Sequence, residues 1–145
     1  MTAMPWEPAA AGYVSPAGQV ELLPEMRGVE MVLAEPASGT AWCARIYDRL
    51  VVLRAAFAQH IRSTEGAAGW YAEVLAAEPR LAGPIGALER EHRSIAAELD
   101  ALCAGLDAAI LATRCGELLH RLSGHRQRDA DLLYEAYDTD LGGET

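Results

Sequence analysis

Three stretches of this chain carry apolar residues at alternating spacings of three and four, and each run contains one histidine. The runs are Cys43, Ile46, Leu50, Leu53, Phe57, His60 and Thr64; Ile85, Leu88, His92, Ile95, Leu99 and Leu102; and Cys115, Leu118, Leu122, His125, Asp129, Leu132 and Ala136. This spacing places each run on one face of a helix, and that face is buried against other helices. The pattern predicts an all-α bundle in which three helices each direct one histidine into a shared core.

Glycine and proline divide the second part of the chain into helices. Alanine, leucine, arginine and glutamate, which are strong helix formers, dominate between the breaks. The predicted helices cover about residues 40–65, 68–77, 84–104 and 107–138. Pro84 suits a first helical turn, Asp107 can cap the last helix, and that helix is expected to end before Gly142 and Gly143. The bundle therefore has three long helices and one short helix, over residues 40–145.

The first 39 residues have a different composition. Five prolines fall there, with glycines between them: Pro5, Pro8, Pro16, Pro24 and Pro36. This density favours an irregular arm over residues 1–39 rather than a long helix. Three long helices alone leave one flank of a bundle uncovered. Residues 21–33 are apolar enough to lie along that flank, or two chains could pair there as a homodimer.

Charge and composition exclude several classes of function. The 145 residues are 51% hydrophobic and carry a net charge of −9, which is typical of an acidic globular domain. Nucleic acid and anionic membrane surfaces would be repelled, and no basic stripe compensates. There is no apolar run long enough to span a bilayer and no secretory signal pattern, so we expect a cytoplasmic protein.

Two other kinds of chemistry lack the residues they need. The three cysteines, Cys43, Cys103 and Cys115, are too few and too far apart for a disulfide framework or a zinc ribbon. The sequence holds no nucleophile elbow and no glycine-rich phosphate loop. We therefore assign no catalytic residue, and activity as an enzyme is not the favoured interpretation.

The histidines on the apolar faces point to metal chemistry. Burying an imidazole without a partner costs about 1–3 kcal/mol, and an unpaired carboxylate costs more. A mutual hydrogen-bond network or a metal ion could satisfy His60, His92, His125 and Asp129. Nitrogen and oxygen donors on facing helices suit iron, zinc or manganese. Glu65, near the end of its helix, is a further candidate ligand.

Two neighbouring features complete this interpretation. His120 lies off its apolar face and is expected to be exposed to solvent. Trp70 and Tyr71 follow the break at Gly69, and we expect them to pack over the end of the bundle close to the metal.

The same residues carry a resemblance to a known family. The Glu91–His92 pair within an apolar helix, and His125-x-x-x-Asp129 running into Leu132 and Leu133, resemble the hemerythrin-like, HHE cation-binding family over roughly residues 41–143. The resemblance implies an up-and-down four-helix bundle with a non-haem iron centre that handles dioxygen, nitric oxide or iron. It implies metal ligands at His60, Glu65, His92, His125 and Asp129.

The chain also departs from the pattern of that family. The family's first-helix histidine is missing, and Thr64 stands where an acid is usual, one residue before Glu65. A di-iron site, a mononuclear site, a site of reduced affinity and a site that has lost its metal all remain open. The favoured function is sensing or storing a metal, dioxygen or nitric oxide. The alternative is a metal-free protein-interaction module with the same fold.

Overall fold

The computed structural model describes the backbone of residues 14–143 and the side chains of residues 22–137. All regular secondary structure in this part of the chain is helical. The elements are α2 (Val14–Leu33), α3 (Gly39–Thr64), α4 (Trp70–Ala77), the 3-10 turn η2 (Pro79–Leu81), α5 (Ala82–Ala104) and α6 (Ala108–Gly143).

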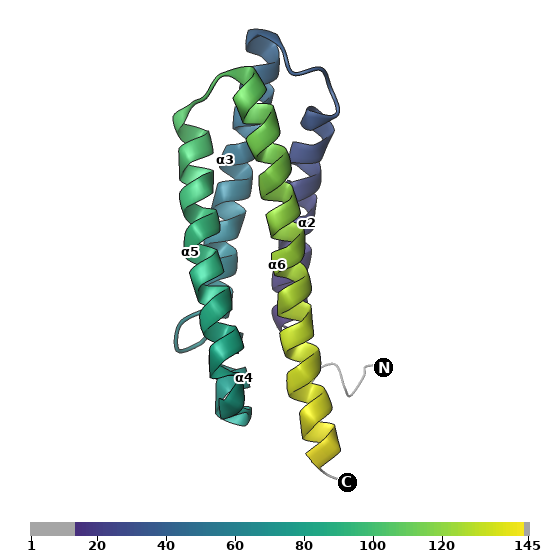
Figure 1. Ribbon diagram of the computed structural model, residues 1–145, viewed down its shortest axis with the longest axis vertical. Helices are drawn as coiled ribbons and strands as arrows, with labels where there is room; N and C mark the ends of the chain where they lie inside the picture. Colours follow the sequence, from purple (N-terminus) through teal and green to yellow (C-terminus); the bar gives the residue numbers. More distant parts are fainter. Residues whose placement is uncertain (1–13, 144–145) are drawn as a thin grey trace.

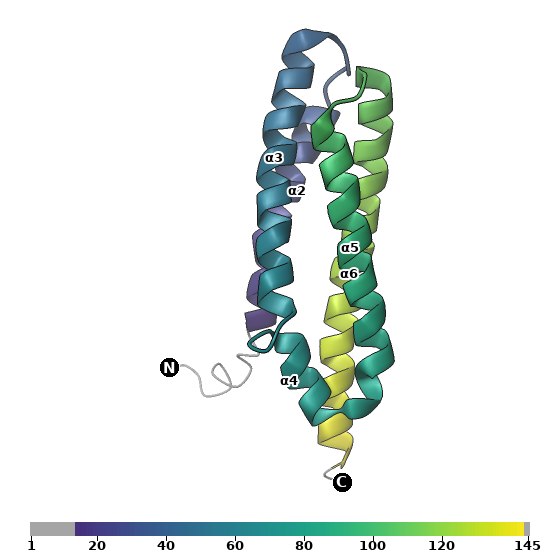
Figure 2. The same cartoon turned by 90° about the vertical axis from the view of Figure 1, so that its left-hand side faces the viewer.

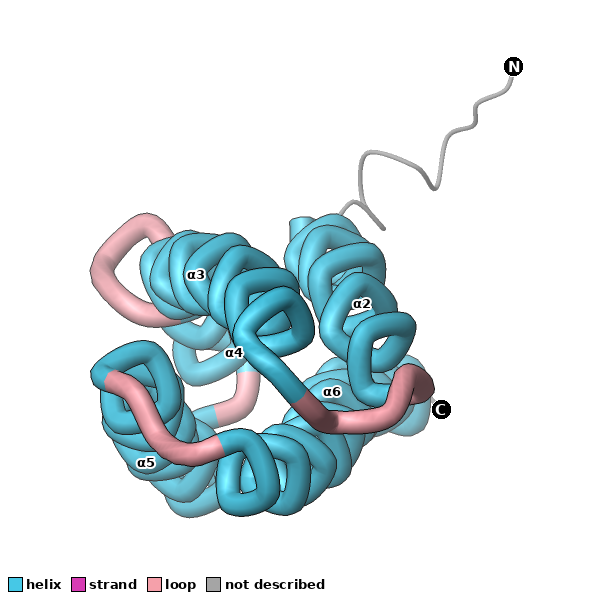
Figure 3. The backbone as a smooth tube through the Cα atoms, turned by 90° about the horizontal axis from the view of Figure 1, so that it is seen from above, coloured by secondary structure: helices cyan, strands magenta, loops and turns pink. Residues whose placement is uncertain are grey.

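The four long helices form an up-and-down bundle. Figures 1 and 2 show α2, α3, α5 and α6 running in alternating directions, with α4 at the end where α3 finishes and α5 begins. Seen from above, the long helices occupy the four corners, so that each packs beside two neighbours (Figure 3). Short connections between antiparallel neighbours are typical of this architecture.

The helices predicted after residue 40 are confirmed, with small shifts at their ends. Asp107 caps α6 as expected, because its Oδ1 accepts hydrogen bonds from the backbone N–H groups of Ala109 and Ile110. The predicted end of α6 is wrong, since the helix continues through Gly142 to Gly143. A glycine costs a helix only about 1 kcal/mol, which does not force it to stop.

The irregular arm predicted for residues 1–39 is wrong over residues 14–33, which form α2. Residues 1–13 lie outside the described part of the chain. Within α2 the buried side chains share one face toward α3 and α6: Leu22, Met26, Val29 and Val32. This segment therefore covers the open flank, as the alternative for residues 21–33 proposed, and the packing reason for a homodimer is removed.

The core consists of two apolar clusters with a polar layer between them. The larger cluster joins α2, α3, α5 and α6 and ends near Phe57, Ile95 and Leu122. The smaller one joins α4, η2, α5 and α6 and includes Leu88 and Leu132. On both α5 and α6, a buried histidine lies between the residues of the two clusters.

Among the described residues, no helix combines the length and apolar character needed to cross a bilayer.

Candidate metal centre

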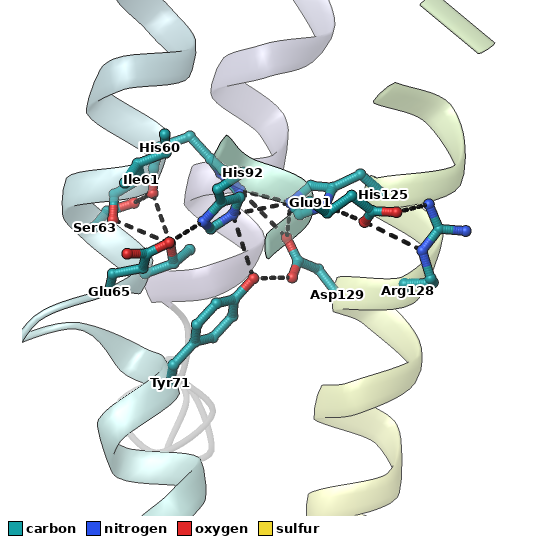
Figure 4. Close-up of polar contacts among 11 residues, drawn as sticks. His60, Ile61, Ser63, Glu65, Tyr71, Glu91, His92, His125, Arg128 and Asp129 are labelled. Carbon is teal, nitrogen blue, oxygen red and sulfur yellow. Dashed lines mark hydrogen bonds and ion pairs between the residues drawn. The ribbon is translucent and has the colours of Figure 1, made fainter. Parts of the chain in front are cut away.

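Three histidines from three helices meet between the two apolar clusters. His60 on α3, His92 on α5 and His125 on α6 are at most 1% exposed. The Nε2 atom of His125 lies 3.3 Å from Nε2 of His60 and 3.1 Å from Nε2 of His92. One ring nitrogen from each residue lies within 4.8 Å of the others (Figure 4). The predicted convergence of the three imidazoles is confirmed, and this group could hold a metal ion.

Asp129 adds a carboxylate to the same point. It is fully buried one turn after His125. Its Oδ2 atom lies 3.3 Å from Nε2 of His60 and 3.4 Å from Nε2 of His125, yet it has no hydrogen-bond partner within the described part of the chain. Its other oxygen, Oδ1, accepts a hydrogen bond of 2.6 Å from the hydroxyl of Tyr71. Oδ2 is thus the oxygen left facing the imidazoles.

Two further carboxylates hold the histidines from outside the cluster. His92 donates from Nδ1 to Glu65 Oε2 at 2.5 Å, and His125 donates from Nδ1 to Glu91 Oε1 at 2.7 Å. Burial raises the pKa of Glu65. Burial acts in the same direction on Glu91, but hydrogen bonds from Arg128 and His125 outweigh it and lower the pKa of that carboxyl. Carboxylates in this position fix the ring and turn its Nε2 lone pair inward.

Glu65 was the candidate ligand whose direction the sequence left open, because it lies at the end of its helix. In the structure its carboxylate contacts the outer nitrogen of His92, while the inner nitrogens face His125 and Asp129. Glu91, adjacent to His92 in the sequence, has the same supporting role toward His125.

Tyr71 is the site residue that the sequence placed only approximately. As predicted, it packs over this end of the bundle together with Trp70, and both are 2% exposed. Its ring stacks on His92 with centroids 5.7 Å apart, and its hydroxyl lies 3.5 Å from Nε2 of that histidine. Two glycines in the loop before α4 allow the chain to turn back over this end of the bundle. Gly66 has a φ of +89°, and a Cβ at Gly69 would lie 2.2 Å from the carbonyl oxygen of Thr64.

Burial and neighbouring groups shift the pKa values of His92, Asp129 and Tyr71. Burial, and then the nearby His125 and His60, lower the pKa of His92 to about 3, so this imidazole is neutral at physiological pH. Burial would raise the pKa of Asp129, but contacts with His60, His125 and Tyr71 lower it overall. Burial and the neighbouring Asp129 raise the pKa of Tyr71, which stays a neutral donor. A neutral imidazole and an ionised carboxylate are the forms in which His92 and Asp129 can bind a cation.

The lining of the cluster on the side of the larger core is apolar. The ring of Phe57 lies 5.7 Å from the rings of both His60 and His92 and 6.1 Å from that of His125, measured between centroids. Nδ1 of His60 has no hydrogen-bond partner within the described residues. His120 is exposed, as predicted, and takes no part in the cluster.

Four of the donor separations match those found around a small metal ion. In a tetrahedral site with metal–ligand distances near 2.0–2.1 Å, neighbouring donors lie about 3.3–3.4 Å apart. Four of the six donor–donor distances are 3.1 to 3.4 Å, and the ring nitrogens of His60 and His92 lie within 4.8 Å of each other. The unpartnered Oδ2 of Asp129 completes a set of three nitrogens and one oxygen, which suits zinc or iron.

Comparison of the chain with protein-family models, curated proteins and solved structures gives no match.

Proposed function

We propose that this protein binds one divalent transition-metal ion in its core, and that it senses or stores that metal. The ligands are Nε2 of His60, His92 and His125 and Oδ2 of Asp129. The ion would neutralise the buried carboxylate and link α3, α5 and α6. The resemblance to the hemerythrin-like family supports iron as the ion, whereas the set of three imidazole nitrogens and one carboxylate oxygen also supports zinc, with manganese as a further candidate.

One observation carries the proposal. Because the Nδ1 atoms of His92 and His125 donate to carboxylates, the Nε2 atom of each ring carries a lone pair in the neutral form of the imidazole. These two Nε2 atoms lie 3.1 Å apart, and Oδ2 of Asp129 lies 3.4 Å from that of His125 without a hydrogen bond. Electron pairs that face each other in a buried core repel one another. A cation among them turns the repulsion into attraction.

Metal analysis tests the proposal directly. Protein purified without chelators, and protein loaded anaerobically with iron(II) or with zinc, is expected to contain about one ion per chain, as ligand geometry of this kind binds a single metal. Failure to retain metal or to gain it on loading would contradict the proposal. The cluster would then be a hydrogen-bonded network in a metal-free interaction module.

Replacing a central ligand gives a sharper test. His92→Ala is expected to abolish metal binding while leaving the helical circular dichroism nearly unchanged, because His92 occupies a single turn of the long helix α5. His120→Ala is the matched control, since it removes an exposed histidine outside the cluster. If His92→Ala keeps its full metal content, the ligand assignment is wrong.

The proposed small ligand is dioxygen or nitric oxide, and it depends on the metal being iron. The support is the resemblance to the hemerythrin-like family. Adding nitric oxide to iron-loaded protein under anaerobic conditions, with zinc-loaded protein as the control, should change the visible absorption only of the iron form. An unchanged spectrum would restrict the function to sensing or storing the metal itself.

A further inference from the structure

The donor cluster is closed to solvent on every described side. The three histidines and Asp129 are at most 1% exposed, so an ion reaches them only if some covering side chain moves. Two surface pockets come near the cluster. One, the α4 pocket, has a volume of about 140 Å³ and is lined by Glu65, Tyr71, Leu75, Ile85 and Glu89 among others. The other, the α5–α6 pocket, has a volume of about 300 Å³ and is lined by Glu91, Arg128 and Asp131 among others.

The two pockets differ in how they contact the cluster. In the α4 pocket, Tyr71 touches both Asp129 and His92 through its hydroxyl, and Glu65 touches His92. A single phenol ring therefore separates this pocket from two of the donors. Figure 4 shows Tyr71 and Glu65 approaching the cluster from the side of α4 and the end of α3.

An ion pair between Arg128 and Glu91 covers the α5–α6 pocket on the side of the cluster. This pocket meets the cluster through Glu91, which accepts hydrogen bonds from His125 and from two nitrogens of Arg128. Opening this side would break the charge-assisted pair of Arg128 and Glu91. It would also break the hydrogen bond that holds Nδ1 of His125. Both pockets carry more acidic than basic side chains, so charge alone does not distinguish them.

We propose that metal ions reach the centre through the α4 pocket, with Tyr71 as the side chain that closes it and Glu89 as a charge that attracts the cation. This inference rests on the proposed metal site. Displacing Tyr71 breaks its hydrogen bond to Asp129 and its contact with His92, and exposes the donors that bind the ion. The short helix α4, which carries Tyr71, follows a loop with a glycine in the left-handed region at Gly66.

Leu75 allows the pathway to be widened or narrowed without touching a ligand. It lines the α4 pocket and is 38% exposed, so its replacement disturbs the core little. Stopped-flow mixing of metal-free protein with Co²⁺ measures uptake, and excess chelator measures release. We expect Leu75→Trp to slow both rates severalfold and Leu75→Ala to accelerate both. The equilibrium affinity should stay the same, because a barrier on the path changes both directions equally.

Ile110→Ala is the matched control for the apolar change. Ile110 is 46% exposed on α6 and lines a pocket remote from the cluster. Rates in both Leu75 variants that equal those of the wild type and of Ile110→Ala would overturn the inference. If the wild-type protein binds no Co²⁺ at all, the proposed function itself fails, and this result is distinct from unchanged rates.

The acidic side chain provides an independent test. Glu89→Gln is expected to slow uptake about two- to fivefold at low salt, and the difference should shrink as salt is added. Glu117→Gln, which removes the same charge from the remote pocket, should leave uptake unchanged. Asp131→Asn tests the α5–α6 pocket. A larger effect of Asp131→Asn than of Glu89→Gln would place the path on the other side and overturn the inference.

Discussion

At the scale of single residues, three of the four inner donors of the cluster are each held by an outer partner. Glu65 orients His92, Glu91 orients His125, and Tyr71 orients Asp129. The hydrogen bond from Tyr71 engages Oδ1 and so leaves Oδ2 toward the imidazoles. Outer partners of this kind typically change metal affinity by about 10- to 100-fold.

Tyr71→Phe should therefore weaken metal binding about 10- to 100-fold while costing about 1 kcal/mol of stability. Competition with a chromophoric chelator measures the affinity, and urea denaturation measures the stability. The control is Tyr47→Phe, because the hydroxyl of Tyr47 bonds the backbone of Leu106 in the α5–α6 connection, away from the cluster. An equal loss of affinity in both variants would show that Tyr71 acts only through general stability.

The inner and outer groups differ in how far the sequence could predict them. His60, His92, His125 and Asp129 were predicted because helical periodicity is local, and each lies on its own apolar face. The pairing of Glu91 with His125 joins residues on different helices, so no spacing along the chain indicates it. The place of Tyr71 depends on the turn at Gly66 and Gly69, whose direction no periodicity encodes.

At the scale of helices, α2 shows why proline density misled the sequence-based prediction. Pro24 lies within α2 on its exposed side, where it removes one backbone hydrogen bond at a cost of about 3 kcal/mol. The same helix buries four large apolar side chains, each contributing about 1.5–3 kcal/mol. Burial against α3 and α6 outweighs the local penalty, and only the tertiary structure shows this balance.

Pro24→Ala should accordingly stabilise the protein by roughly 1–3 kcal/mol, because alanine restores the hydrogen bond and favours the helix. The shift of the urea midpoint at constant slope measures the change. Pro84→Ala is the control: Pro84 is exposed in the first turn of α5, where a proline displaces no helical hydrogen bond, so little change is expected. A loss of stability in Pro24→Ala would mean that α2 requires a bend at this residue.

At the scale of the whole molecule, the polar layer separates the two parts of the hydrophobic core. The larger cluster includes α2, whereas the smaller one is built by α4, η2, α5 and α6. Without an ion, the helices meet at this level through imidazoles and carboxylates. An ion bound there would fasten α3, α5 and α6 to one another and tie the smaller cluster to the larger one.

Metal binding should therefore stabilise the molecule unevenly. At a free metal concentration 100 times the Kd, mass action adds about 2.7 kcal/mol to global stability. Amide hydrogen exchange with and without zinc should show the largest gain in protection around His60, His92 and His125 and across α4, because local opening there breaks the metal links. The N-terminal half of α3 and the C-terminal half of α5, which lie away from α4, should gain only the protection that the global increase in stability gives. A uniform gain along all helices would show that the two core clusters already unfold together without the ion.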